Sequence, residues 1–376
     1  MISANDGADK IRIDSISLPN FEISWAGGNP FGPGYWLGSE GGRIQITGFV
    51  NPEWAGPYAV SPSGDAVNGM AFADDLWAVS TRSEVVFLNV PYTGEGHVEQ
   101  AVFHGGAHGV VSTQSGSIVA SLGKRGILST GPKSAAIQRV QALRPADDAL
   151  NIYRVVSLMS PGRGEVLACA GRQGGIAALL LNGADGGGFG QKLQPPGMDF
   201  IDVAALGVDG YPLAIVALGL DCSICLVRDL LGDRNTNRLR FNPVGERGFR
   251  VLCAEGHVFL LTNKRLYSFV NLAARFLDGD AFAHPTTVRW LDIEAVDASL
   301  AFDRTLLVVM PNCVYRIPID SLVTDGVRLA DHLGLRSEKR MSKETLPTDL
   351  GDKSWESFEK SPWGKPVELQ LAAGIV

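Results

Sequence analysis

One pattern returns seven times along this chain of 376 residues and limits what it can fold into. Each copy is an apolar strand, a short polar turn and a second strand. Residues 37–46 (LGSEGGRIQI) show it well, because Ile44 and Ile46 alternate with polar residues after a Gly-Gly turn. We place the copies at residues 23–49, 67–90, 117–129, 165–181, 212–230, 257–270 and 305–319.

The spacing of these hairpins predicts a propeller. Steps of 42, 42, 49, 47, 44 and 48 residues separate the ends of the first hairpin strands, which we place at Gly38, Ser80, Leu122, Gly171, Leu218, Thr262 and Met310. A period of about 40–50 residues with three or four strands per unit is typical of propeller blades. We therefore expect an all-β, seven-bladed β-propeller over residues 1–330, with about four antiparallel strands per blade. Two stacked β-sandwich domains are the alternative.

Both ends of the chain offer a strand that could close the ring. Residues 10–18 alternate apolar and polar side chains and could form the outer strand of the last blade, which would remove an open sheet edge. Residues 366–376 are the rival. Residues 331–376 form a charged tail with three aromatic residues, Trp355, Phe358 and Trp363. The tail is either a solvated linker or a segment that anchors on the propeller or on a partner.

Composition excludes several classes of protein. The net charge is −7, so the chain as a whole repels nucleic acid and anionic membranes. No apolar run approaches the roughly 20 residues of a membrane span. The N-terminal residues show no pattern of a secretory signal, and five cysteines suit free thiols in a reducing compartment. These features predict a cytoplasmic protein.

Residues 11–319 resemble the WD40-like β-propellers. The segment 67–75 (VNGMAFADD) looks like the inner strand and turn of such a blade, and residues 223–230 (SICLVRDL) resemble the strand that usually ends in Trp-Asp. Gly96-His97, followed by residues 101–103, looks like the Gly-His opening of a blade. The resemblance implies the fold, and closure by an N-terminal strand, without indicating a subfamily or a function.

Basic residues recur in the hairpin turns. Five of the seven turns carry them at nearly the same position: Arg43, Arg82, Lys124, Arg125, Arg172, Lys264 and Arg265. On one face of a propeller they would form a basic crown that attracts an acidic peptide or a phosphate-bearing ligand. The alternative is that exposed turns are often charged.

Other motifs carry little chemistry. His104 and His108 have a metal-binding spacing only on a helix, which two intervening glycines disfavour. Cys222 and Cys225, three residues apart near a strand, would point to opposite faces. The Gly-rich segment 183–190 lacks the residues of a phosphate loop, so we expect no cofactor and no metal.

The sequence therefore favours a noncatalytic scaffold subunit that presents one propeller face to a protein partner. A propeller hydrolase or lyase with an axial site is the first alternative. Binding of a nucleic acid or a phosphate-bearing ligand by a basic face is the second, although the acidic pI of about 5.4 makes nucleic acid an unfavourable ligand for this chain alone.

Overall fold

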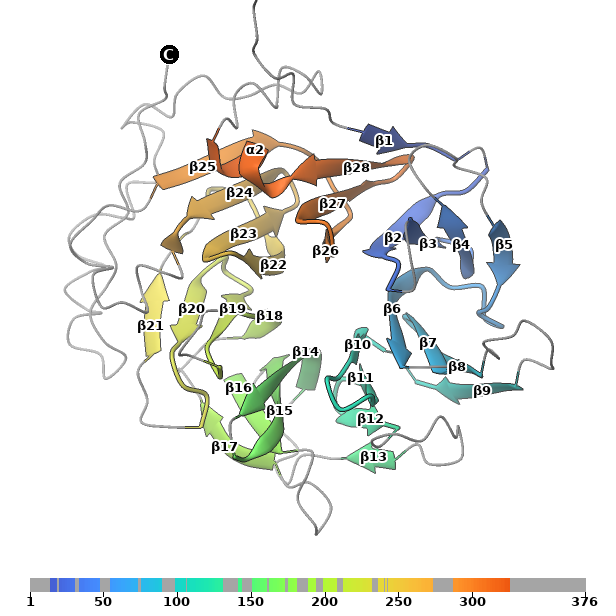
Figure 1. The fold of residues 1–376 in the computed structure, drawn as a ribbon, viewed down its shortest axis with the longest axis horizontal. Coiled ribbons are helices and arrows are strands. Elements are labelled where there is room, and N and C mark those ends of the chain that lie inside the picture. Colours follow the sequence, from blue (N-terminus) through green and yellow to red (C-terminus); the bar gives the residue numbers. More distant parts are fainter. Residues whose placement is uncertain are drawn as a thin grey trace, which may run out of the picture.

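Seven four-stranded antiparallel sheets surround a common axis in the computed structural model (Figure 1). The structure describes residues 14–324, apart from residue 19 and residues 31–33, 48–54, 74–75, 90–98, 106, 131–140, 144–150, 161, 173–174, 181–188, 194–198, 208–211, 232–235, 240, 242 and 273–286. The expected seven-bladed propeller is confirmed, and the two-sandwich alternative is excluded.

Each of the first four blades runs from an innermost to an outermost strand in chain order. Blade one contains β2 (Ile23–Gly28), β3 (Tyr35–Ser39), β4 (Arg43–Thr47) and β5 (Ala55–Ala59). Blade two contains β6 (Val67–Ala73), β7 (Leu76–Thr81), β8 (Glu84–Asn89) and β9 (Glu99–His104). Blade three contains β10 (Gly109–Ser112), β11 (Ile118–Ser121), β12 (Ile127–Ser129) and β13 (Gln141–Leu143). Blade four contains β14 (Asn151–Ser160), β15 (Gly164–Arg172), β16 (Gly175–Leu180) and β17 (Phe189–Leu193).

The last three blades continue this order until the ring closes. Blade five contains β18 (Phe200–Ala205), β19 (Ile215–Gly219), β20 (Ile224–Val227) and β21 (Thr236–Leu239). Blade six contains β22 (Gly248–Ala254), β23 (His257–Thr262), β24 (Arg265–Val270) and β25 (Thr287–Asp292). Blade seven contains β26 (Asp297–Ala301), β27 (Thr305–Met310) and β28 (Cys313–Pro318), followed by the short helix α2 (Ile319–Thr324).

The fourth strand of blade seven comes from the other end of the chain. β1 (Asp14–Ile16) pairs antiparallel with β28, with Asp14 opposite Arg316 and Ile16 opposite Val314. Ile16 is buried with Leu307 and Val309, so apolar packing supports the backbone pairing. Closure by the N-terminal strand is thus confirmed. The rival strand at residues 366–376 lies outside the described residues.

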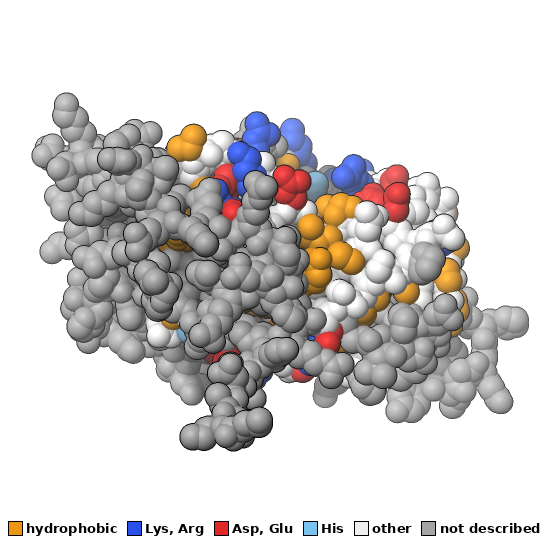
Figure 2. All heavy atoms as spheres, turned by 90° about the horizontal axis from the view of Figure 1, so that it is seen from above, with side chains coloured by type: hydrophobic (Ala, Val, Ile, Leu, Met, Phe, Trp, Pro, Cys, Tyr) orange, Lys and Arg blue, Asp and Glu red, His pale blue; other side chains and the backbone are white. Residues whose placement is uncertain are grey.

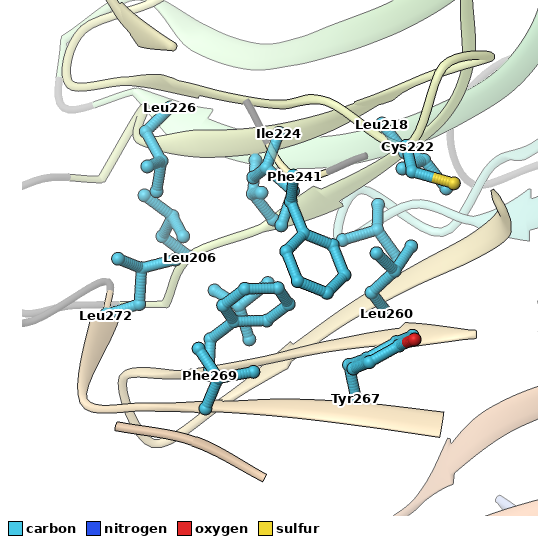
Figure 3. Close-up of a cluster of buried hydrophobic side chains, with 14 of the residues drawn as sticks. Leu206, Leu218, Cys222, Ile224, Leu226, Phe241, Leu260, Tyr267, Phe269 and Leu272 are labelled. Carbon is cyan, nitrogen blue, oxygen red and sulfur yellow. The ribbon is translucent and has the colours of Figure 1, made fainter. Parts of the chain in front are cut away.

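Apolar side chains fill the space between neighbouring blades. Figure 3 shows the cluster between blades five and six, in which Phe241 lies among residues of both sheets. Its ring meets those of Tyr267 and Phe269 edge to face, with centroids 4.7 and 5.1 Å apart. Each blade packs against a neighbour on both of its faces. The second strands, such as β19 and β27, are therefore almost continuously apolar.

The predicted hairpins coincide with the second and third strands of each blade. Every predicted end of a first hairpin strand lies within two residues of the observed end of β3, β7, β11, β15, β19, β23 or β27. In the first turn only Gly42 needs its glycine conformation, with φ of 67°, and a Cβ there would lie 2.6 Å from Cβ of Ser61.

One reading based on the resemblance was wrong. Residues 101–103 do not open a blade, because they belong to β9, the outermost strand of blade two. Blade three opens at β10 instead, and its first strand is only four residues long. Residues 223–230 are placed as expected, because β20 is the third strand of blade five. Gly96-His97 lies outside the described residues.

Candidate functional site

The basic turns share one face of the propeller. Because all blades repeat the same strand order around one axis, every turn from second to third strand emerges on the same side. These turns join β3 to β4, β7 to β8, β11 to β12, β15 to β16, β19 to β20, β23 to β24 and β27 to β28. We call this side the turn face. The loops that lead from each blade into the next also end here.

The cations of the turn face differ in how far they are engaged by the protein. Arg82, Lys124 and Lys264 are exposed, and no hydrogen bond or ion pair joins their charged groups to another described residue. Their charges are therefore available to a ligand. Arg172 ends β15 on the same side, and the structure describes its backbone alone.

Arg43 and Arg125 are partly used in local structure. A guanidinium nitrogen of Arg43 donates to the carbonyl oxygen of Asn20 at 3.1 Å, and the group lies over the ring of Phe21. Nη1 of Arg125 donates to the carbonyl oxygen of His104 at 2.8 Å. Each bond occupies one side of a guanidinium group that has five N–H donors, so both residues keep donors for a ligand.

Arg265 has a structural role. Its Nη1 lies 2.8 Å from Oε1 of the buried Glu246, and its Nε lies 2.7 Å from Oδ1 of Asp292. Glu246 also accepts hydrogen bonds from the hydroxyls of Thr262 (2.6 Å) and Tyr267 (2.9 Å). This network ties the loop before blade six to its second and third strands. Arg265 is therefore not a free member of the basic crown.

Two features of the turn face were not predicted from the sequence. Arg247 is exposed in the loop that enters blade six, where its backbone bonds to Asn263 beside Lys264. Three apolar side chains are also exposed on this face in blades five to seven: Leu220 (39% exposed), Val244 (77%) and Val296 (43%). They precede or follow strands, where single apolar residues give no periodic signal.

A second candidate feature is a position on the innermost strands that carries a charged residue in four of the seven blades. This position pairs with the second strand of the same blade, close to the end of that strand. From blade one to blade seven its residues are Trp25, Gly69, Gly109, Arg154, Asp202, Arg250 and Asp297. We call this set the inner ring. Blades four to seven carry charges of alternating sign, and blades one to three carry none.

Arg250 and Asp297 form the tightest pair of the inner ring. Nε and Nη2 of Arg250 donate to the two carboxylate oxygens at 2.7 and 2.9 Å, and both side chains are about nine-tenths buried. Asp202 accepts the backbone N–H of Val251 at 2.8 Å and lies 3.9 Å from Nη1 of Arg250. These contacts join the innermost strands of blades five, six and seven.

Arg154 has much weaker support. Its one charged contact is from Nε to Oδ1 of Asp202, at 4.0 Å, and no hydrogen bond joins its guanidinium to a described residue. Nη1 lies over Gly109, where a Cβ would be 2.2 Å away. Burial, together with repulsion by Arg250, lowers the pKa of Arg154 to about 10, against the attraction of Asp202 and Asp297. The guanidinium is charged at neutral pH, and Asp202 neutralises this charge only in part.

The sequence contains a signal for the charged half of the ring. Arg154, Asp202, Arg250 and Asp297 follow one another at intervals of 48, 48 and 47 residues. Each stands between two apolar or aromatic residues. A charged residue repeated in register with the blade period predicts a shared buried position.

The predicted weak motifs behave as expected where the structure describes them. His104 ends β9 and His108 precedes β10, so no helix joins them, and the His108 ring stacks on Tyr153 with centroids 4.4 Å apart. Cys222 and Cys225 pack into clusters on opposite faces of blade five. Burial raises the pKa of Cys222 to about 12, which disfavours a reactive thiolate.

Within the described ranges, no group of three or more His, Cys, Asp or Glu side chains is placed to hold a metal ion. The segment 183–188 and the tail aromatics Trp355, Phe358 and Trp363 lie outside the described residues. Figure 2 views the propeller from its side and shows Lys and Arg side chains gathered along one edge, with acidic side chains among them. On that side the charge is therefore mixed.

Comparison with known proteins supports the fold. No family model and no curated protein searched matches this chain. Among solved structures, the β-propeller domain of Cps50 (Swd1) from Myceliophteria thermophila matches with a TM-score of 0.59 and 10% identity, over 81% of this chain and 99% of that one. The likeness to WD40-like propellers is thus confirmed for the fold alone. Among the residues that the structure describes, no helix is long and apolar enough to cross a membrane.

Proposed function

We propose that the protein is a noncatalytic interaction platform that presents its turn face to a protein partner. The observation that carries this proposal is the placement of Arg82, Lys124 and Lys264. They come from blades two, three and six, are exposed, and share one face with charges that no described residue neutralises. A rigid ring that holds cations from distant parts of the chain on one side favours a ligand broad enough to reach several blades.

The apolar residues of the same face favour a protein as that ligand. Leu220, Val244 and Val296 expose side chains on blades five to seven, the part of the turn face that also carries exposed Arg247 and Lys264. Protein interfaces combine apolar contacts with arginine and a polar rim, whereas a nucleic acid needs a dense basic surface. The net charge of −7 further disfavours a nucleic acid. The partner surface would be acidic, and a cytoplasmic location remains part of this proposal.

Charge reversal tests the proposal. The variant Arg82→Glu/Lys124→Glu/Lys264→Glu should lose partners that copurify with the wild-type protein from a cell extract, as quantified by mass spectrometry. Binding by the wild-type protein should also weaken as salt is raised, because exposed charges are screened within about 10 Å at 0.1 M salt.

Blade four offers a matched control. Arg163 is exposed in the β14–β15 turn, on the opposite face. Arg163→Glu and Lys124→Glu make the same change in charge on the two sides, so only Lys124→Glu should weaken capture. Equal retention of the partners by the triple variant and the wild type would exclude the turn face as the binding surface.

A further inference from the structure

Arg154 marks a place where the inner ring is incomplete. Asp297 is fully engaged by Arg250, and Asp202 divides its charge between Arg250 and Arg154 at 3.9 and 4.0 Å. On the side of blade three the next ring residues are Gly109 and Gly69, which supply no anion. The alternating series of charges therefore ends on Arg154, whose one nearby carboxylate is shared with Arg250.

Solvent reaches this cation. The side chain of Arg154 is 24% exposed, against 5% for Asp202 and 10% for Arg250. No guanidinium nitrogen of Arg154 is both buried and without a hydrogen-bond partner. A ligand can therefore approach N–H donors that no described residue uses. Folding has already removed part of the guanidinium from bulk water, so binding adds a smaller desolvation cost.

The cation also lies close to the turn face. Gly123 lies in the β11–β12 turn, next to Lys124, and forms two backbone hydrogen bonds with Ile152, at 3.0 and 3.1 Å. Arg154 follows Ile152 by two residues, across a register shift between β14 and β15. His108 stacks on Tyr153 between them, and Nε2 of His108 lies 3.1 Å from a Cβ built on Gly123. A group that enters between Lys124 and the axis would meet His108 and Arg154.

We propose that Arg154 is the anchor of a binding site for a single carboxylate group, reached from the turn face beside Lys124 and His108. The inference rests on the proposed function, because it names the chemistry of the group that the turn face receives. Asp202 selects a carboxylate over a phosphate, since its charge 4.0 Å from Nε repels a phosphate group with two charges more strongly than a carboxylate group, which carries one. The carboxylate belongs either to an acidic side chain or to a free acid.

Binding of a fluorescently labelled hexaglutamate peptide to the purified protein tests the site. Fluorescence anisotropy at low salt should show binding by the wild type that Arg154→Met weakens about tenfold or more, the usual value of charge-assisted hydrogen bonds. Arg163→Met, on the opposite face of the same blade, should leave binding unchanged. Equal binding by these two variants would overturn the proposal.

Two further variants keep the test decisive if Arg154→Met fails to fold. Asp202→Asn removes the competing charge but keeps an acceptor for the N–H of Val251, so it should bind the peptide more tightly than the wild type. Gly109→Ala displaces the guanidinium without removing its charge and should bind more weakly. Folded Asp202→Asn that binds no more tightly than the wild type would exclude the site.

Competition identifies the source and the class of the anion. Displacement of the peptide by glutarate in the wild type, but not in Arg154→Met, would assign a site open to free carboxylates. Failure of glutarate to displace a peptide that still depends on Arg154 would assign the site to acidic side chains of a protein. Displacement by inorganic phosphate as effective as that by glutarate would overturn the choice of a carboxylate.

The outer cations separate this inference from the proposed function. In the Arg82→Glu/Lys124→Glu/Lys264→Glu background, Arg154→Met should still reduce glutarate binding. Loss of partner capture by the triple variant, with unchanged capture by Arg154→Met, would keep the turn face and exclude the Arg154 site. Arg154-dependent binding of glutarate, with unchanged partner capture by the triple variant, would keep the Arg154 site and exclude the turn face as the surface that binds the partner.

Discussion

The inner ring and the turn face both carry cations, and their surroundings give these cations different roles. In blade six, Arg250 is bound by both oxygens of Asp297 on the innermost strand, while Lys264 is exposed in a turn. The boundary between the two roles falls between adjacent residues, since Arg265 is paired with Glu246 and Asp292. A cation that is closely paired with a carboxylate holds the fold, and a cation without such a partner is available to a ligand.

The largest expected effect comes from breaking the central pair of the inner ring. Asp297→Ala should lower the free energy of unfolding by about 3–5 kcal/mol, because it leaves Arg250 buried without its main counter-ion. Urea denaturation measures this loss.

An apolar replacement of both partners sharpens that test. Arg250→Met/Asp297→Leu should recover most of the lost stability, because a buried pair replaced by apolar residues of similar size often costs little. A double variant as unstable as Asp297→Ala would mean that the inner ring needs the pair itself for its geometry.

A smaller effect distinguishes the two neighbours at the turn of blade six. Arg265→Met should cost about 1–3 kcal/mol, because Glu246, with a side chain only 1% exposed, loses its charged partner. Lys264→Met is the matched variant and should stay within about 0.5 kcal/mol of the wild type. Thermal unfolding of the two variants compares them directly, and equal costs would remove the distinction drawn here between structural and available cations.

Acid should remove the stability contributed by Glu84, a buried carboxylate beneath the turn face. Burial favours the neutral form of Glu84, yet hydrogen bonds from Ser61 and Ser63 hold its pKa below the ordinary value. A depressed folded-state pKa stabilises the protein above the unfolded-state pKa of about 4.3, and this stability is lost as the pH falls through the folded-state value.

The variant Glu84→Gln tests this link. It should be less stable than the wild type by about 1–2 kcal/mol at pH 7, because the charge-assisted hydrogen bonds are gone. The difference should shrink as the pH is lowered from about 5 to 3, as followed by denaturation at each pH. A difference that stays constant over this range would show that the hydrogen bonds do not depend on the charge.

The smallest effect on stability belongs to the exposed cations. Arg82→Glu, Lys124→Glu and Lys264→Glu should each change the free energy of unfolding by no more than about 0.5 kcal/mol, because no described residue depends on them. The measurement is urea denaturation at 0.15 M salt. A large loss in any of them would move that residue from the available to the structural class.

The fold could be predicted from the sequence because the propeller repeats its signal. The seven hairpins placed the end of each second strand to within two residues, and the alternation in residues 10–18 marked one of two candidate closing strands, the one that pairs with β28. The interpretation of residues 101–103 as the opening of a blade was wrong because it rested on a dipeptide, which gives no period to check it against. Local turn chemistry located the cations, but it could not show that Arg265 faces Glu246, which lies 19 residues earlier in the chain.

The site was harder to predict for the same physical reason. Exposure and pairing depend on contacts between blades, such as that of Arg250 with Asp297, 47 residues apart. The intervals between Arg154, Asp202, Arg250 and Asp297 did carry that information, since equal spacing in a repeat means equal position. Exposed apolar residues such as Val244 have no such regularity, and only the structure locates them.

The pairing of β1 with β28 has a consequence for the order of events during synthesis. Asp14 leaves the ribosome early but its contact, Arg316, is made 302 residues later. Until then β1 has no partner strand, and its unpaired backbone groups can pair with another chain. Closure of the ring therefore depends on β1 staying free of other partners until β28 has been made.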